Sequence, residues 1–120
     1  MDLQSRPSEP IAVLFSGGLD STVLLAELLN RGHRVQPIYV AMGCIWESAE
    51  RVAVQRWLAE MASPQLEPLV ALSQPVEDLY GEHWSITGVD APDASTPDKA
   101  VFLWGRNALL LLKSLLWCQQ

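Results

Sequence analysis

The sequence predicts an α/β fold in which a parallel-stranded sheet is covered by helices on both faces. A continuous apolar run over residues 11–15 is typical of a strand that is buried on both sides. The glycine pair Gly17-Gly18 then joins this run directly to a segment with helical periodicity. Two further strand-like runs follow, separated by a second helical segment. Strands that alternate with helices of this length favour right-handed crossovers and parallel pairing.

The first elements come after a lead-in over residues 1–10, which is rich in serine and proline and is expected to be flexible. After the strand and the glycines, a helix is predicted over residues 21–30, with Gly32 as its C-terminal stop. The apolar side chains expected on its buried face are Val23, Leu24, Leu25 and Leu28.

The middle of the chain predicts another strand, a helix and a third strand. Residues 34–40 form the second strand, where Pro37 indicates an edge position or a bulge. Residues 47–61 form the helix, and residues 66–72 form the third strand, interrupted by Pro68. The apolar positions that recur at helical spacing are Val54, Trp57, Leu58 and Met61.

The last third combines a long loop with an apolar helix. Residues 73–104 hold several prolines and glycines and few periodic apolar positions, which predicts a functional or disordered loop. Residues 108–118 are almost wholly apolar, and we expect a buried helix in which Cys118 packs with its neighbours. This helix runs into Gln119 and Gln120 without a stop signal. Residues 1–120 are therefore expected to form a single, incomplete domain.

Composition excludes several classes of protein. The chain has 120 residues, 49% of them hydrophobic, and a net charge of −6, with its basic residues scattered. This disfavours nucleic acid as a partner. No apolar run is long enough to span a membrane and no secretory signal is present, so a cytoplasmic protein with reduced cysteines is expected. Cys44, which follows the second strand, is considered for a persulfide role but has no basic neighbour in the sequence.

The glycine loop carries the predicted chemistry. A loop that leaves a buried strand and opens a helix presents several backbone N–H groups to one point, where the helix N-terminus adds partial positive charge. Glycines let the backbone approach phosphate oxygens, and nearby hydroxyls donate further hydrogen bonds. The residues predicted to form this phosphate-binding loop are Phe15, Ser16, Gly17, Gly18, Leu19, Asp20, Ser21 and Thr22.

Asp20 is the unusual member of this loop, because a carboxylate repels phosphates unless a cation lies between them. We therefore predict that Asp20 holds Mg²⁺, and the alternative is that it caps the helix or places favourable charge at its start. Two rival phosphate loops do not fit. The Walker pattern needs a lysine, and none occurs in residues 1–98. The dinucleotide pattern needs a third glycine, where this chain has Asp-Ser-Thr.

At these residues the sequence resembles the ATP pyrophosphatase (PP-loop) superfamily, whose motif is Ser-Gly-Gly-x-Asp-Ser/Thr. Within that superfamily it is similar to the 7-cyano-7-deazaguanine synthase family, through residues 14–22 and through Gly105-Arg106-Asn107 before the last helix. The resemblance implies a Rossmann-like fold of the adenine nucleotide alpha hydrolase type.

The resemblance also implies a reaction, in which ATP adenylates the carboxylate of 7-carboxy-7-deazaguanine and ammonia displaces AMP on the way to the nitrile. Ser16 and Asp20 are then the catalytic candidates. Arg106 would bind a phosphate or carboxylate, and Asn107 the nucleotide or substrate. The alternative for this pair is that Asn107 caps the last helix and Arg106 lies in solvent.

The partners expected on this basis are ATP, Mg²⁺, ammonia and a small deazaguanine, with a homodimer as the assembly considered. The family carries four zinc-binding cysteines, whereas this chain has only Cys44 and Cys118, so we expect it to bind no zinc. The alternatives are another PP-loop amide ligase, a tRNA thiolation enzyme, or a nucleotide-binding fragment without turnover.

Overall fold

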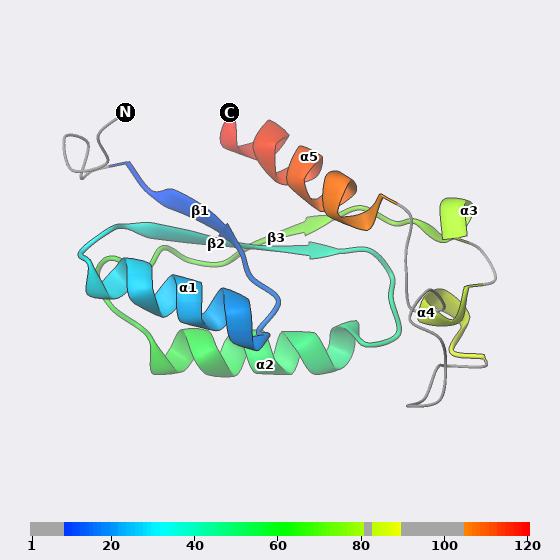
Figure 1. Ribbon diagram of the computed structural model, residues 1–120, viewed down its shortest axis with the longest axis horizontal. Helices are drawn as coiled ribbons and strands as arrows, with labels where there is room; N and C mark the ends of the chain where they lie inside the picture. Colours follow the sequence, from blue (N-terminus) through cyan, green and yellow to red (C-terminus); the bar gives the residue numbers. More distant parts are fainter. Residues whose placement is uncertain (1–8, 81–82, 90–104) are drawn as a thin grey trace.

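The computed structural model describes residues 9–80, 83–89 and 105–120 and forms an α/β fold (Figure 1). Three strands make one sheet of order β1-β2-β3, with both neighbouring pairs parallel. The elements, in chain order, are β1 (Ile11–Leu14), α1 (Leu19–Asn30), β2 (Val35–Ala41), α2 (Glu47–Glu60), β3 (Val70–Ser73), α3 (Glu77–Tyr80), α4 (Trp84–Thr87) and α5 (Arg106–Cys118). The predicted order of strands and helices is confirmed.

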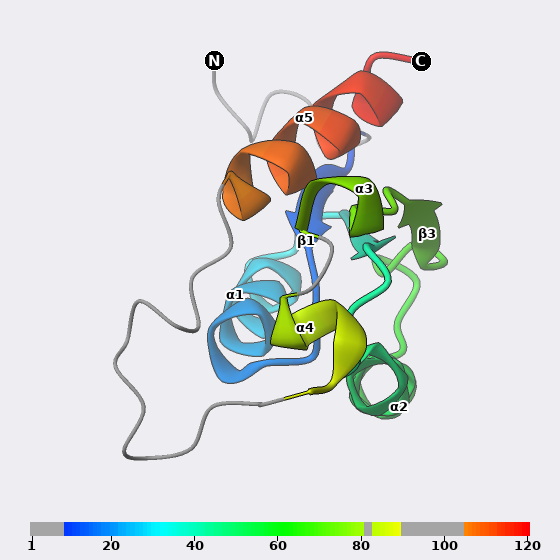
Figure 2. The same ribbon diagram turned by 90° about the vertical axis from the view of Figure 1, so that its right-hand side faces the viewer.

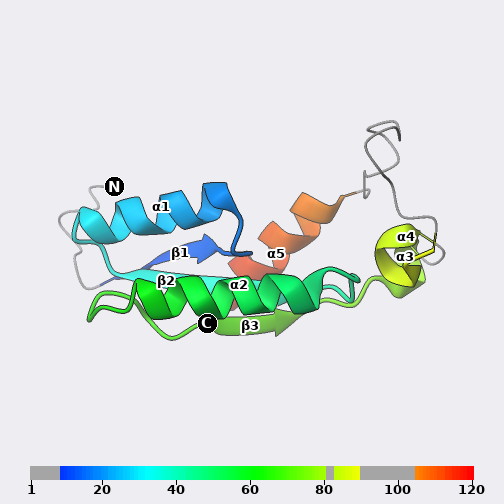
Figure 3. The same cartoon turned by 90° about the horizontal axis from the view of Figure 1, so that it is seen from below.

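Helices cover both faces of the sheet, as predicted. α1 and α2 lie side by side on one face, and α5 lies across the other (Figures 2 and 3). Side chains of β2 alternate between the two faces of the sheet. Val35 and Tyr39 pack in the core under α1 and α2, whereas Ile38 and Val40 pack in the core under α5. Burial on both sides explains why β2 is apolar at nearly every position.

The prediction for Pro37 was wrong in one respect and right in the other. β2 is the central strand, so Pro37 is not at an edge. However, the ladder between β2 and the segment before β3 contains a bulge. Val35 pairs with Leu66 and Ile38 pairs with Val70, so two residues of β2 face three residues, 67–69. The extra residue lies beside the proline.

A central proline is tolerated because this part of the ladder needs no donor from it. In a parallel strand the N–H and C=O of one residue point to the same neighbour. The Val35 N–H and C=O both bond to the chain on the β3 side, to Gln65 and Glu67. Pro37, two residues later, faces the same side, at the bulge. The Gln36 side-chain amide donates to the Pro37 and Pro68 carbonyls, at 2.9 Å and 2.8 Å. These bonds replace the missing ladder contacts.

α1 begins two residues earlier than predicted, at Leu19, and buries a narrower face. Leu25 is fully buried, but Val23 and Leu24 are 58% and 50% exposed, so their predicted burial was wrong. A helix that lies on a sheet at an angle buries one stripe, and the sequence did not reveal how wide this stripe is. The positive φ of Gly32 ends the helix as expected.

α5 is also only half covered. Leu109, Leu110 and Trp117 pack against the sheet, and Ser114 is buried with its hydroxyl donated to the Leu110 carbonyl at 2.8 Å. The prediction of a fully buried helix was wrong, because the leucines on its other face are 54% to 58% exposed. These are Leu111, Leu112, Leu115 and Leu116. Cys118 is likewise exposed rather than packed.

The segment predicted as a long loop, residues 73–104, holds the end of β3 and the single-turn helices α3 and α4 in its described part. His83 caps the start of α4, where its Nδ1 accepts a hydrogen bond from the Ser85 N–H at 3.2 Å, and Gly88, with positive φ, caps its end. Residues 81–82 and 90–104 of this segment, and residues 1–8 of the predicted lead-in, lie outside the described residues. No helix among those described is both long and apolar enough to cross a membrane.

Candidate functional site

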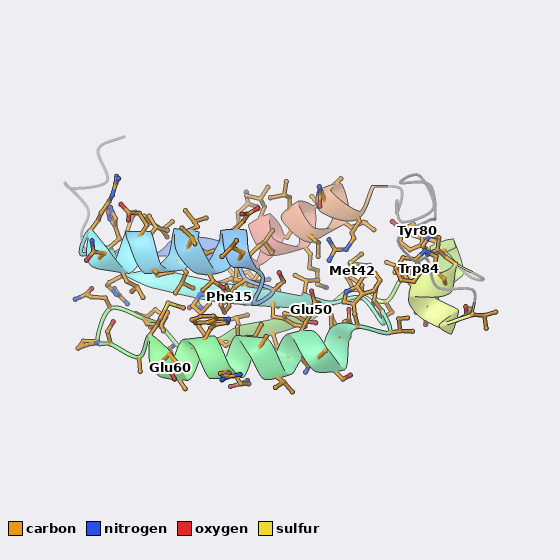
Figure 4. All side chains as sticks on the ribbon, turned by 60° about the horizontal axis from the view of Figure 1, so that its bottom comes forward. Phe15, Met42, Glu50, Glu60, Tyr80 and Trp84 are labelled. Atoms are coloured by element: carbon orange, nitrogen blue, oxygen red, sulfur yellow. The ribbon has the colours of Figure 1, made fainter. Side chains whose placement is uncertain are left out.

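The glycine loop leaves the carboxyl end of β1 and is held tightly against α2. Phe15 is buried between the sheet and α2 (Figure 4), and its N–H donates to the Ile38 carbonyl at 2.8 Å. Gly17 has φ +81°, and a Cβ there would lie 2.9 Å from the Ala53 Cβ and 3.0 Å from the Val54 nitrogen. Only glycine fits this position without displacement. The conformation of the loop is therefore fixed by its packing against α2 as well as by the turn at Gly17.

The loop opens α1 as an anion site requires. Gly18 is the N-cap residue, with extended φ and ψ, and no side chain caps the helix there. The first N–H groups of a helix lack intrahelical acceptors. Here they form the positive end of the dipole of a twelve-residue helix. Residues 16–20 at this helix start are therefore a candidate phosphate site.

The polar side chains of the loop are not all available to that site. The Thr22 hydroxyl is buried and donates to the Gly18 carbonyl at 2.6 Å, and the Ser21 hydroxyl makes a longer contact of 3.4 Å with the same oxygen. Ser16 is half-buried and lines a pocket. Thr22 thus braces the turn in this structure, whereas Ser16 belongs to the pocket lining.

Asp20 and Leu19 are exposed, in the first turn of α1. Asp20 is the second residue of the helix and Gly18 is the N-cap, so the capping part of the alternative is wrong, whereas its charge does lie in the first turn. Its charge still favours the helix start, by about 0.3 to 1 kcal/mol. No group of three or more potential metal ligands occurs among the residues that the structure describes.

The second motif lies beside the first. Arg106, the first residue of α5, and Ser16 line one pocket of about 100 Å³ at the carboxyl ends of β1 and β2. Arg106 is half-buried, and its Nε is buried without a hydrogen-bond partner. The alternative that places Arg106 in solvent is therefore wrong.

Asn107 does not share this position. It is exposed in the first turn of α5, and the N-cap is Gly105 with φ +66°, so the expectation that Asn107 caps the helix is also wrong. The structure brings Phe15, Ser16 and Arg106 together around one pocket and leaves Asn107 outside its lining.

Two further residues line the pocket that the sequence did not single out. Glu50, from α2, accepts a hydrogen bond from the Tyr39 hydroxyl at 3.1 Å. Burial raises the pKa of Glu50, while hydrogen bonds from Tyr39 and Trp46 and the charge of Arg106 act to lower it. Burial, followed by the charge of Glu50, raises the pKa of Tyr39, so the phenol stays protonated and remains a donor.

A signal for Glu50 was present in the helical spacing of α2. Glu50 stands four residues before the buried Val54, which places both on the sheet-facing side of the helix. A carboxylate in the buried stripe of an amphipathic helix is an exception to the pattern. That exception could have identified Glu50 before the structure was known.

Cys44 is buried just beyond β2, and its pKa is raised to about 11 by burial and by the charge of Glu47, against a smaller opposing effect of Arg106. Arg106 is the basic neighbour that the sequence alone did not reveal, but it does not outweigh burial. Because the thiolate is the reactive form, this environment disfavours a persulfide role.

We expect the two cysteines to differ strongly in alkylation by iodoacetamide at pH 7.5. Cys118 is exposed and should react within minutes, whereas Cys44 should stay largely unmodified until the protein is unfolded. Peptide mass spectrometry after timed quenching measures both in one sample. Equal rates for the two residues in the native protein would contradict the burial of Cys44.

Comparison with known proteins gives one informative similarity. The chain is 34% identical over 104 residues to 7-cyano-7-deazaguanine synthase 1 of Desulfitobacterium hafniense (strain Y51), an alignment that covers 84% of this chain and 46% of that protein. No protein-family model matches the chain, and no solved structure matches it. The similarity supports the family resemblance of the sequence motifs, but the chain spans less than half the length of the relative.

Proposed function

We propose that this chain binds ATP at residues 15–22 and uses it to adenylate the carboxylate of a 7-deazaguanine, which ammonia then converts toward the nitrile. The observation that carries the proposal is the glycine loop, because Gly17 packs against α2 and Gly18 is the N-cap of α1, without a side chain that caps the helix. The name of the similar protein supplies the acceptor class. The ligase chemistry follows from the resemblance of the loop motif.

Different groups of the loop would bind different phosphates of ATP. Backbone N–H groups at the start of α1 would stabilise negative charge on the β- and γ-phosphates as the bond to the α-phosphate breaks. Ser16 lines the pocket, and its hydroxyl would donate to the α-phosphate or to the carboxylate that attacks it. Catalysis of this kind is mainly positioning and electrostatic stabilisation.

Asp20 fits a magnesium ion bound together with nucleotide. It is exposed beside the candidate phosphate site, and no ion pair engages it within the described part of the chain. Mg²⁺ commonly uses one or two protein carboxylates and completes its shell with water and phosphate oxygens, so a single aspartate is sufficient. When bound, the ion would offset the charge of the phosphates.

Release of AMP and pyrophosphate from ATP tests the proposal. The purified 120-residue chain is incubated with ATP, Mg²⁺, ammonium and 7-carboxy-7-deazaguanine, and nucleotides are separated by chromatography. We expect AMP formation that requires the deazaguanine carboxylate. ATP binding without AMP formation would instead support nucleotide binding without turnover. AMP formed with other carboxylates would favour another amide ligase of the superfamily.

A further inference from the structure

Two residues of opposite charge line the pocket beside the glycine loop. Glu50 comes from α2 and Arg106 from α5, and both line the same space of about 100 Å³. The two side chains influence each other electrostatically. In the described part of the chain they share no ion pair or hydrogen bond, and the buried Arg106 Nε has no acceptor at all.

This pairing restricts what the pocket can bind. A phosphate or carboxylate placed against Arg106 would also meet the charge of Glu50, and an ammonium ion placed against Glu50 would meet Arg106. A neutral group that carries N–H donors beside a carbonyl acceptor satisfies both, because carboxylates only accept and guanidinium only donates hydrogen bonds. The aminopyrimidinone edge of a guanine-type base has this arrangement.

We propose that Glu50 and Arg106 bind the aminopyrimidinone edge of the acceptor base, with Glu50 accepting from its ring N–H and 2-amino group and Arg106 donating to its carbonyl. The inference rests on the proposed function for its choice of acceptor. Tyr39 is a positioning residue, since its hydroxyl holds Glu50 Oε1 at 3.1 Å. One water molecule needs about 10 to 15 Å³ of such space, so the pocket accommodates several ligand atoms.

Ionisation of Glu50 also affects the stability of the fold. Because burial raises the pKa of Glu50, the folded state binds a proton more readily than the unfolded chain. Stability therefore falls as pH rises through the two pKa values, and above them the ionised carboxylate lowers the stability of the fold. A charge that destabilises the free protein is typical of a ligand-binding group rather than a structural one.

The test compares Glu50→Gln with Glu60→Gln, a matched control at the exposed far end of α2 (Figure 4). Glutamine keeps an acceptor for Tyr39 but loses the carboxylate that pairs with two donors. Calorimetric titration with 7-deazaguanine, and with 7-deazahypoxanthine that lacks the 2-amino group, measures base binding. Titration with ATP and the melting temperature at pH 7.5 are recorded for each protein.

We expect Glu50→Gln to weaken 7-deazaguanine binding about 10- to 100-fold, as loss of a charged hydrogen-bonding partner does. It should also remove the preference over 7-deazahypoxanthine, leave ATP affinity unchanged and not lower the melting temperature. Glu60→Gln should match the wild type throughout.

Each remaining outcome is decisive. Equal base binding by wild type and Glu50→Gln would overturn the inference even if the wild type forms AMP, and the proposed function would then stand alone. Base binding that depends on Glu50 without any AMP formation would support the inference and contradict the proposed function. Absence of base binding in the wild type, or failure of Glu50→Gln to fold, would overturn the inference.

Discussion

Replacement of Gly17 by alanine is expected to lower the free energy of unfolding by about 2 to 4 kcal/mol and to abolish ATP binding. Two effects contribute. Alanine at φ +81° is strained, by about 1 to 2 kcal/mol. The new Cβ would also lie 2.9 Å from Ala53 Cβ and 3.0 Å from the Val54 nitrogen, so the loop must move away from α2. Denaturant unfolding and ATP titration measure the two consequences.

Gly32→Ala separates strain from packing. Gly32 has nearly the same φ, +84°, but a Cβ there would meet nothing within 4 Å. This variant should lose only the strain energy, about 1 to 2 kcal/mol, and should bind ATP normally. If Gly17→Ala is no more destabilising than Gly32→Ala and still binds ATP, then the contact between the loop and α2 does not position the phosphate site.

The fold was predictable because its strongest signals are local. The apolar run before Gly17 is typical of a strand, although β1 lies at the edge of the sheet and only Val13 within it is buried, and the alternation of strands with helices favours parallel pairing. The position of Pro37 was not predictable. Its acceptance in the central strand depends on a bulge at residues 67–69, which lie about thirty positions later, and on the Gln36 side chain. Local rules for proline contain neither contact.

The site was predictable only in its first half. The glycine loop predicts an anion site, because its residues are contiguous and offer backbone N–H groups and hydroxyls as hydrogen-bond donors. The pocket beside it is built from β1, β2, α2 and α5, and its charged members Glu50 and Arg106 stand more than fifty residues apart. Nothing in the sequence spacing pairs them. The exposure of Val23 and of the outer leucines of α5 was missed for a related reason, since periodicity marks apolar positions but not which of them are covered.

Ser16→Ala and Asp20→Ala are expected to abolish adenylation, and Asp20→Ala to weaken Mg²⁺-dependent ATP binding about 100-fold. The Ser16 variant loses the hydroxyl of a residue that lines the pocket, and removal of one donor at a developing charge typically lowers the rate 10²- to 10³-fold. Asp20 loses the carboxylate proposed to hold Mg²⁺. ATP titration with and without EDTA, and AMP formation by chromatography, measure both effects.

Glu27→Ala is the matched control for Asp20→Ala, because Glu27 lies on the same helix and its ion pair with Arg31 is exposed. A role of Asp20 in helix stability alone predicts a lower melting temperature, by the small free energy of a charge at a helix start, with ATP affinity unchanged. A role in holding Mg²⁺ predicts the same small fall in melting temperature and, in addition, an ATP affinity that is weaker and no longer responds to EDTA. If Ser16→Ala and Asp20→Ala both retain nucleotide affinity and activity, residues 15–22 are not the phosphate site. The packing of Gly17 against α2 would then be a structural feature alone.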